Sequence, residues 1–319
     1  MNKNLYDTLA YYNNSLAFRE WQNELAQKLY AVLQNNLRAN EVTTVTELCN
    51  ALNNERYGGI SITTNKIHGK KSYVDFDYKG AMKKKELADM VIISLITNNR
   101  ELLFSKVALV QNKKWNTPMT WDIDQEQLYL LMNFPTFSGL SSKIGTVQDN
   151  VFLNHSGTLG NYGLFSDDGE LVLATAKSVF CQQANRKVKF DDIKKYADYS
   201  PLTVNFPFFY GSQFTEELYY LYKRCGIFLL HSAIPFCNKY NVALNMHEFV
   251  RNLTWFNIGE PSMAFGRACD NNLQNFSERI LYAAFGDTGE NLSFQTSRWD
   301  EGIENEFFVI RMQIELKEQ

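Results

Sequence analysis

The feature that most constrains the fold of this chain is a pair of apolar segments, residues 89–96 and 102–111, that lie close together in the sequence. Both have the length and the β-branched content of strands. The polar tetrad Thr97-Asn98-Asn99-Arg100 between them is typical of a tight turn. The sequence therefore predicts an antiparallel hairpin, in which the numbers of paired residues sum to roughly 200.

Polar side chains begin abruptly at the open end of this predicted hairpin. Asp89 opens the first strand, and the sum rule places it opposite Gln111 at the end of the second strand. Lys113 follows two residues later and projects on the same side as Gln111, because side chains alternate along a strand. A carboxylate, an amide and an ammonium group are thus expected to converge where the apolar pairing ends.

Helices and further strands are predicted on both sides of the hairpin. Apolar residues recur at steps of three and four from 18 to 38, which indicates an amphipathic helix, and a shorter helix is expected from about 44 to 54. Asp124 is placed to cap a third helix that Pro135 ends. The remaining predicted strands are 60–64, 73–78, 162–165, 170–175 and 307–316, the last of them half-exposed, and helices are expected at 215–224 and 245–253.

Composition narrows the classes of protein that the chain can belong to. The AVILMFWYC residues make up 45% of the chain, enough for a sizeable core, and no uncharged apolar run approaches the ~18–20 residues of a membrane helix. The five cysteines are scattered and the four histidines show no zinc-ligand spacing, so we expect neither a disulfide framework nor a zinc site. No signal peptide is evident at the start, and a cytoplasmic location is expected.

The polar cluster at the hairpin end suits the hydrolysis of a phosphodiester bond. A carboxylate binds Mg²⁺ through oxygen, and the ion keeps several waters and binds phosphate as well. A lysine beside the ion can orient or deprotonate the attacking water and stabilise the negative charge of the transition state. Each residue also has a plain structural interpretation: Asp89 as a strand cap, Gln111 as an edge partner and Lys113 as part of a solvated turn.

The segments Glu86-Leu-Ala-Asp89-Met-Val-Ile-Ile and Val107-Ala-Leu-Val-Gln111-Asn-Lys113-Lys114 resemble the PD-(D/E)xK nuclease superfamily. The match is to its QxK branch, which includes Mrr-type restriction enzymes and bacterial antiphage nucleases. The resemblance implies an α/β fold of the restriction-endonuclease-like type, with a mixed central sheet flanked by helices. The order of elements agrees from about 18 to 176, whereas the specific part covers only the two quoted segments.

The resemblance also implies a role for each residue of the cluster. Asp89 takes the position of the metal-binding acid, Gln111 the variable second position and Lys113 that of the catalytic lysine. We expect Gln111 either to hold Lys113 in place or to bind the metal. Glu24 is the best match for an additional acid from the first helix, with Glu47 as the alternative. No proline precedes Asp89, and Gln111 brings no charge to the metal, so the usual second acid is missing.

Lysines near the cluster are candidates for binding DNA phosphates. Residues 66–85 hold seven lysines against two aspartates, although such a segment can equally be a solvated loop. The six candidates are Lys70, Lys71, Lys83, Lys84, Lys85 and Lys114. Because the formal net charge of the whole chain is −3, we expect modest affinity for DNA unless a partner contributes.

Together these features predict a cytoplasmic DNA endonuclease that depends on Mg²⁺ or Mn²⁺. The resemblance suggests the effector or nuclease subunit of a prokaryotic antiphage system, working with a partner subunit or as a homodimer and without a membrane. The alternative is a weak or inactive nuclease-fold subunit that acts as a sensor or scaffold, and an RNA nuclease is a more distant one. Residues 1–200 are expected to form the nuclease core, and 201–319 an accessory or regulatory α+β extension or an elaboration of the same core.

Overall fold

The computed structural model describes residues 8, 11–12, 14–67, 73–139, 148–153, 155, 157–181, 187–197, 242–264, 266–286 and 307–316. The helices within these residues are α2 (Leu16–Asn35), α3 (Glu41–Leu52), α4 (Gln125–Asn133), α5 (Ala176–Cys181), α6 (Phe190–Ala197), α8 (Met246–Thr254) and α9 (Asn271–Phe285). The expected helix at 215–224 lies outside the described residues.

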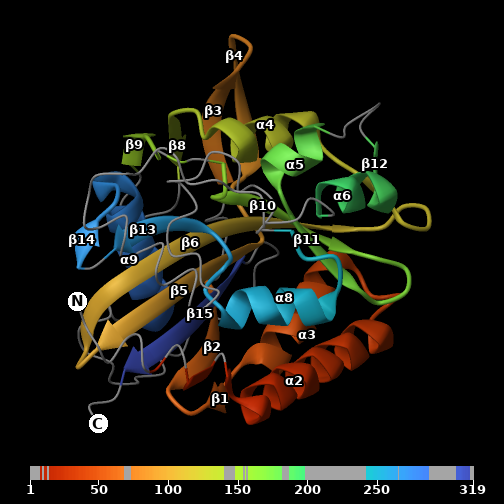
Figure 1. Ribbon diagram of the computed structural model, residues 1–319. Coiled ribbons are helices and arrows are strands. Elements are labelled where there is room, and N and C mark those ends of the chain that lie inside the picture. The colour runs from red at the N-terminus through yellow and green to blue at the C-terminus, as the bar shows by residue number, and fades with distance from the viewer. Residues whose placement is uncertain are drawn as a thin grey trace.

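The described strands and these helices build a mixed α/β architecture (Figure 1). They are β1 (Glu55–Tyr57), β2 (Ile60–Ile67), β3 (Tyr73–Tyr78), β4 (Ala81–Glu86), β5 (Met90–Asn98), β6 (Glu101–Lys114), β7 (Thr120–Asp122), β8 (Phe137–Gly139), β9 (Gln148–Val151), β10 (Gly160–Phe165), β11 (Leu171–Thr175), β12 (Lys187–Lys189), β13 (Glu260–Ala264), β14 (Arg267–Ala268) and β15 (Phe307–Leu316).

The predicted hairpin forms the centre of the main sheet. Met90 of β5 lies opposite Val110 of β6, so the numbers of paired residues sum as expected along most of the hairpin. Asn99 and Arg100 make a two-residue turn with φ of 49° and 70°. Positive φ at both central positions matches the right-handed twist of the flanking strands. A register shift between Ile96 and Thr97 joins this turn to the regular pairing.

Nine described strands make up the main sheet, in the order β1-β2-β15-β5-β6-β10-β11, with β13 on β6 and β14 on β13. Pairing is parallel between β15 and β5 and between β10 and β6, and antiparallel elsewhere. β13 and β10 occupy successive stretches of the same edge of β6. The strands β4-β3-β8-β9 form a second sheet, and β12 and β7 a third.

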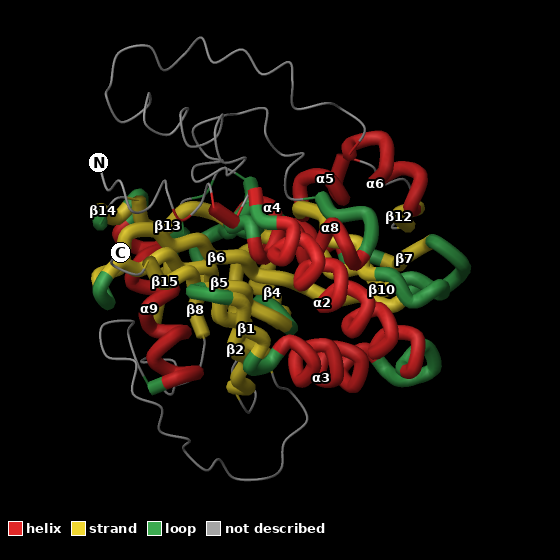
Figure 2. Tube along the Cα trace, turned by 60° about the horizontal axis from the view of Figure 1, so that its bottom comes forward, coloured by secondary structure: helices red, strands yellow, loops and turns green. Residues whose placement is uncertain are grey.

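Helices cover both faces of the main sheet. Figure 1 shows α2, α3 and α8 below it and α4 and α5 above it, and Figure 2 shows α2 lying beside α3. The apolar stripe of α2, including Phe18, Leu25 and Leu29, packs into the lower core with α3 and α8. The apolar residues of α4, α5 and α9 fill the upper core. This two-sided cover explains why most residues of β5 and β6 are buried.

Strand β15 corrects one sequence prediction. Its alternating Arg311, Gln313 and Glu315 predicted a half-exposed strand, yet Arg311 and Gln313 are both buried. The strand lies between β2 and β5, and α9 covers the face that carries these polar residues. The Arg311 guanidinium carbon is 4.4 Å from the centroid of the Phe285 ring on α9, and its Nε donates to Thr63 Oγ1 at 3.1 Å. Stacking and hydrogen bonding thus replace the solvent that the alternation implied.

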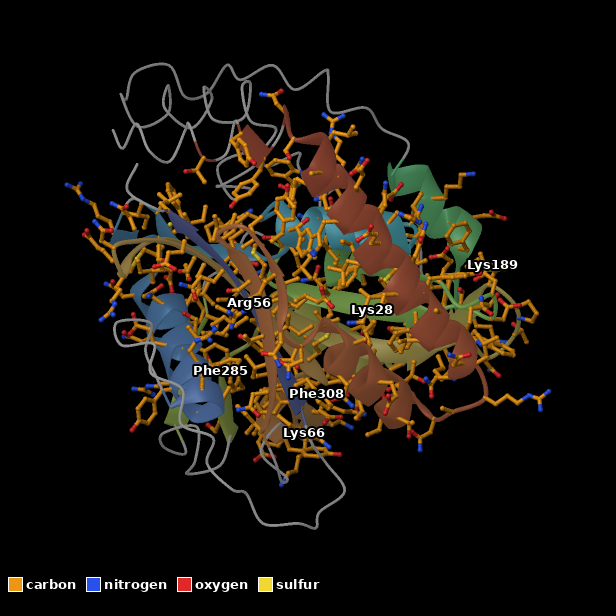
Figure 3. The ribbon with its side chains drawn as sticks, turned by 90° about the horizontal axis from the view of Figure 1, so that it is seen from below. Lys28, Arg56, Lys66, Lys189, Phe285 and Phe308 are labelled. Atoms are coloured by element: carbon orange, nitrogen blue, oxygen red, sulfur yellow. The ribbon has the colours of Figure 1, made fainter. Side chains whose placement is uncertain are left out.

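The opposite end of β15 shows a related contact. Figure 3 shows Lys66 and Phe308 lying close together, and the Lys66 Nζ lies 5.3 Å from the centroid of the Phe308 ring. Phe308 N–H also donates to the carbonyl of Asp89 at 2.9 Å. The last described strand of the chain therefore helps to anchor the beginning of the predicted hairpin.

The main sheet crosses the division expected at residue 200. β15 lies inside the sheet, and β13 pairs directly with β6. Residues on both sides of position 200 therefore contribute strands to the main sheet. Among the described helices, none is both long and apolar enough to cross a membrane.

Candidate active site

Asp89 lies at the bend between β4 and β5, and its backbone is held on both sides. Its N–H donates to the Val110 carbonyl at 3.0 Å, which continues the hairpin pairing to the end of the apolar segment. Its side-chain Oδ2 accepts from Gln111 Nε2 and from the Asn112 N–H, both at 2.6 Å. Two hydrogen bonds to one oxygen therefore hold the carboxylate in a fixed orientation.

Gln111 connects Asp89 to helix α4. Its Oε1 accepts from Gln127 Nε2, and Gln127 also donates to the Glu86 carbonyl at 2.9 Å. Two of these bonds form a chain in one direction, from the Gln127 amide through Gln111 to the Asp89 carboxylate. In this arrangement Gln111 orients Asp89. The expected role as a metal ligand requires its amide oxygen to leave Gln127.

Lys113 meets an acid that sequence reasoning did not select. Its Nζ lies 3.4 Å from Oε1 of Glu41, and both side chains are partly exposed, at 22% and 30%. Oε2 of Glu41 accepts from the Lys114 N–H at 3.2 Å. Glu41 is the first residue of α3, where the Asn40 side chain caps the helix. This helix thus aims a carboxylate at the end of β6.

Burial and neighbouring acids disfavour the ionised form of the Asp89 side chain. Its pKa is raised well above the usual value, first by burial and then by the charges of Glu86 and Glu41, while Lys113 and the Asn112 N–H act in the opposite direction. The pKa of Glu41 is also raised, chiefly by burial, with Lys113 opposing and Glu86 adding to the rise. The charges of these three carboxylates therefore act on one another, and Lys113 opposes the rise in the pKa of both Asp89 and Glu41.

Glu86 acts electrostatically on Asp89, whereas Glu24, the expected additional acid, is exposed on α2. Continuous strand alternation would turn Glu86 away from Asp89, but the chain bends between β4 and β5, and the Glu86 charge reaches both other acids. Glu24 is exposed on α2, and Glu47 lies further along α3 than Glu41. Within the described residues, Glu41 is the helical acid that contacts Lys113. The signal that could have found it is the capping pair Asn40-Glu41.

The candidate DNA-binding lysines fall into different environments. Lys83 pairs with Glu126 at 2.7 Å, and Lys85 pairs with Asp124 at 2.8 Å and Glu126 at 3.0 Å. Lys84, on the other side of β4, is exposed and has no ion pair within the described part of the chain. Two of the three β4 lysines are thus already balanced by the first turn of α4.

Lys114, one of the candidates for binding phosphate, donates hydrogen bonds to backbone carbonyls that follow α2. Its Nζ donates to the carbonyls of Asn36, Leu37 and Ala39 at 3.2, 2.8 and 2.5 Å. A cation in this position adds hydrogen bonds to carbonyls of the turn that follows α2, where the negative end of the helix dipole lies. Lys70 and Lys71, the remaining candidates, lie outside the described residues.

The donors at this site suit an oxygen-ligated divalent cation better than a softer metal. No group of three His, Cys, Asp or Glu side chains in the described residues is arranged to hold a metal ion. Mg²⁺ requires less, because it is commonly bound through one or two carboxylates, several waters and a substrate phosphate. Asp89 and Glu41 are two carboxylates that could hold such an ion, whose charge would offset the burial and the neighbouring acids that raise the pKa of each.

Comparisons with known proteins identify no relative of this chain. No family model matches the chain, and searches of curated proteins and of solved structures also find no match. Function is therefore inferred from the residues that the fold brings together: Asp89 with Gln111 and Gln127, and Lys113 with Glu41.

Proposed function

We propose that the chain is a metal-dependent endonuclease that cuts DNA, with Asp89, Glu41 and Lys113 as its catalytic residues. The observation that carries the proposal is the convergence of Asp89 and the Glu41–Lys113 pair at the open end of the β5–β6 hairpin. The mixed sheet with helices on both faces is compatible with a restriction-endonuclease-like core. Burial of Asp89 beside other acids is the kind of perturbation that marks functional sites.

In the proposed mechanism each residue has a separate task. Asp89 and Glu41 bind Mg²⁺ or Mn²⁺, and Gln111 holds Asp89 in its orientation. When bound, the cation neutralises charge on the phosphate and makes a bound water more acidic. Lys113 would orient the attacking water and stabilise negative charge on the phosphate oxygens.

The biological setting is part of the proposal and rests on the sequence resemblance. We place the chain in a prokaryotic antiphage system, in the cytoplasm, as a nuclease subunit or a homodimer. The net charge of −3 and the ion pairs of Lys83 and Lys85 support a need for a partner in DNA binding. RNA is the competing substrate, and substrate competition distinguishes the two.

A non-catalytic sensor or scaffold is the second candidate. It is favoured by the bond that commits the Gln111 amide oxygen to Gln127, and by the neutral amide that stands where the superfamily has an acid. In that case the polar network at the hairpin end serves only to join β6 to α4 and α3. The two candidates differ in whether the network has to bind a cation.

Cleavage of supercoiled plasmid in Mg²⁺ tests the proposed function. Asp89→Asn and Lys113→Ala are expected to lower the nicking rate by on the order of 100-fold or more, because each removes a group that acts on the reacting phosphate or water. Glu20→Gln, at an exposed position of α2, is the control and should cut at the wild-type rate. Equal nicking by all four proteins contradicts the assignment.

A second comparison tests which helix supplies the additional acid. Glu41→Gln is expected to weaken Mn²⁺ binding, measured by calorimetry, by about 10-fold or more, since the ion loses a carboxylate ligand. Glu24→Gln is expected to leave the affinity unchanged, because Glu24 is exposed on α2. The opposite pattern returns the role to Glu24, the residue that the sequence resemblance favoured.

A further inference from the structure

Tyr162 stands beside the candidate active site on the neighbouring strand. β10 runs parallel to β6, and Tyr162 is the direct partner of Gln111 in the register. Paired residues on adjacent strands project from the same face of a sheet. Gln111 and Tyr162 therefore point toward α4, and Asp89 bonds to Gln111 from the β5 side. The ring of Tyr162 is completely buried, with 0% of its surface exposed.

The hydroxyl of Tyr162 has no hydrogen-bond partner within the described residues. A buried hydroxyl without a partner costs stability, so such a group in a native fold calls for an explanation. The charges of Asp124 and Asp89 both raise the pKa of Tyr162, in addition to the effect of burial. The phenol therefore lies within electrostatic reach of two carboxylates, one of which is the central acid of the site.

Asp89 is the better acceptor of the two. Oδ1 of Asp124 already accepts from the N–H groups of Glu126 and Gln127, and Oδ2 accepts from Lys85. The two hydrogen bonds to the Asp89 side chain are both accepted by Oδ2. Among the described residues no hydrogen bond is accepted by Oδ1 of Asp89, which thus retains capacity for a further donor.

We propose that Tyr162 is a positioning residue for Asp89, with its hydroxyl donating to a buried water that in turn donates to Oδ1 of the Asp89 carboxylate. This inference rests on the proposed metal-binding role of Asp89. Gln111 and the Asn112 N–H hold Oδ2 of Asp89, and Tyr162 would hold Oδ1 through the water. Groups that orient a ligand without touching the metal typically change its metal affinity by 10–100-fold.

Calorimetric titration of the full-length chain with Mn²⁺ tests the inference. The variants are Tyr162→Phe, which removes only the hydroxyl, and Asp89→Asn. Tyr57→Phe is the matched control, because the Tyr57 hydroxyl bonds to Ser15 at the start of α2. Tyr162→Phe is expected to weaken Mn²⁺ binding about 10-fold with an unchanged melting temperature in the absence of metal. Tyr57→Phe should bind Mn²⁺ as the wild type does.

The outcomes separate this inference from the proposed function. If Asp89→Asn abolishes binding and Tyr162→Phe binds as tightly as the wild type, the positioning role of Tyr162 is overturned and the metal site stands. If Asp89→Asn binds Mn²⁺ normally, or the wild type binds none, the metal site itself fails and the role of Tyr162 fails with it. A purely structural hydroxyl would change the melting temperature and leave the affinity for Mn²⁺ unchanged.

Discussion

Strand β6 carries two lysines in opposite environments, and the contrast shows what the open end of the hairpin provides. Lys106 is 0% exposed, whereas the side chain of Lys113 is 22% exposed. Burial lowers the pKa of Lys106 to about 7, with the charge of Glu260 acting in the opposite direction. Lys113 keeps a carboxylate within 3.4 Å and remains partly open to solvent.

The difference follows from the neighbours of β6 at each position. Lys106 has Ser94 of β5 on one side and Pro261 of β13 on the other. Beyond Val110 the pairing with β5 ends, and within the described part of the chain Lys113 has one strand partner, Leu164 of β10. Burial in the sheet interior favours the neutral form of Lys106, while the partly exposed side chain of Lys113 can reach a solute. Position along one strand therefore separates a structural lysine from a candidate catalytic one.

The largest expected effect is a difference in cleavage between two matched variants. Lys113→Met is expected to lower the rate of plasmid nicking by on the order of 100-fold or more, since it removes the ammonium beside the phosphate. Lys106→Met is expected to cut within a few-fold of the wild-type rate, because Met has nearly the same shape and Lys106 lies away from the site. Gel assays with folding checked by circular dichroism measure both. Loss of nicking in Lys106→Met alone would reverse the comparison.

A second prediction concerns the effect of Asp89 on the free energy of unfolding. The pKa of Asp89 is raised in the folded state, so its favourable contribution is complete below the unfolded pKa and is lost as pH rises through the folded pKa. Asp89→Asn is therefore expected to raise the free energy of unfolding near pH 7, by about 1.4 kcal/mol for each unit by which the folded pKa exceeds the unfolded one. Urea denaturation measures the gain, which should vanish below about pH 4. If Asp89→Asn were less stable than the wild type at pH 7, the raised pKa of Asp89 would be contradicted.

The third prediction tests the interior lysine. The folded pKa of Lys106 is about 7, below the unfolded value of about 10.4, so the unfolded chain binds more protons between these limits. This group makes the wild type more stable as pH rises from 7 toward 10, by up to about 1.4 kcal/mol per pH unit. Lys106→Met should flatten that slope in urea denaturation at pH 7, 8 and 9. Identical slopes in both proteins would mean that Lys106 stays charged.

The smallest expected effect is on DNA affinity and compares two lysines of β4. Lys84→Ala should weaken binding a few-fold and reduce the salt dependence by about one counterion, because this exposed ammonium is available to a phosphate. Lys85→Ala should have less effect, because its charge is already balanced by Asp124 and Glu126. Fluorescence anisotropy at several salt concentrations measures both. A larger loss for Lys85 would show that its ion pairs open on binding.

Local sequence patterns predicted much of the scaffold. The hairpin and its register followed from two apolar segments and a polar turn, and Asp124 caps α4 as expected. Asp89 and Gln111 also meet as the register implied. These features depend on residues close in the chain, where alternation and capping act directly. Strand β4 was missed because the run Ala-Met-Lys-Lys-Lys-Glu has no apolar alternation, and it pairs with β3 through the backbone.

The sequence by itself determined the hairpin, its register and the acid, amide and lysine that the register gathers at one end. Only the tertiary structure decided which helix brings a further acid, because α2 and α3 both carry glutamates and their packing alone sets which one reaches Lys113. It also decided that β15 is buried, since α9 covers a polar face that looks exposed in the sequence. Contacts between distant segments depend on which faces the core has already occupied, and no local pattern records that.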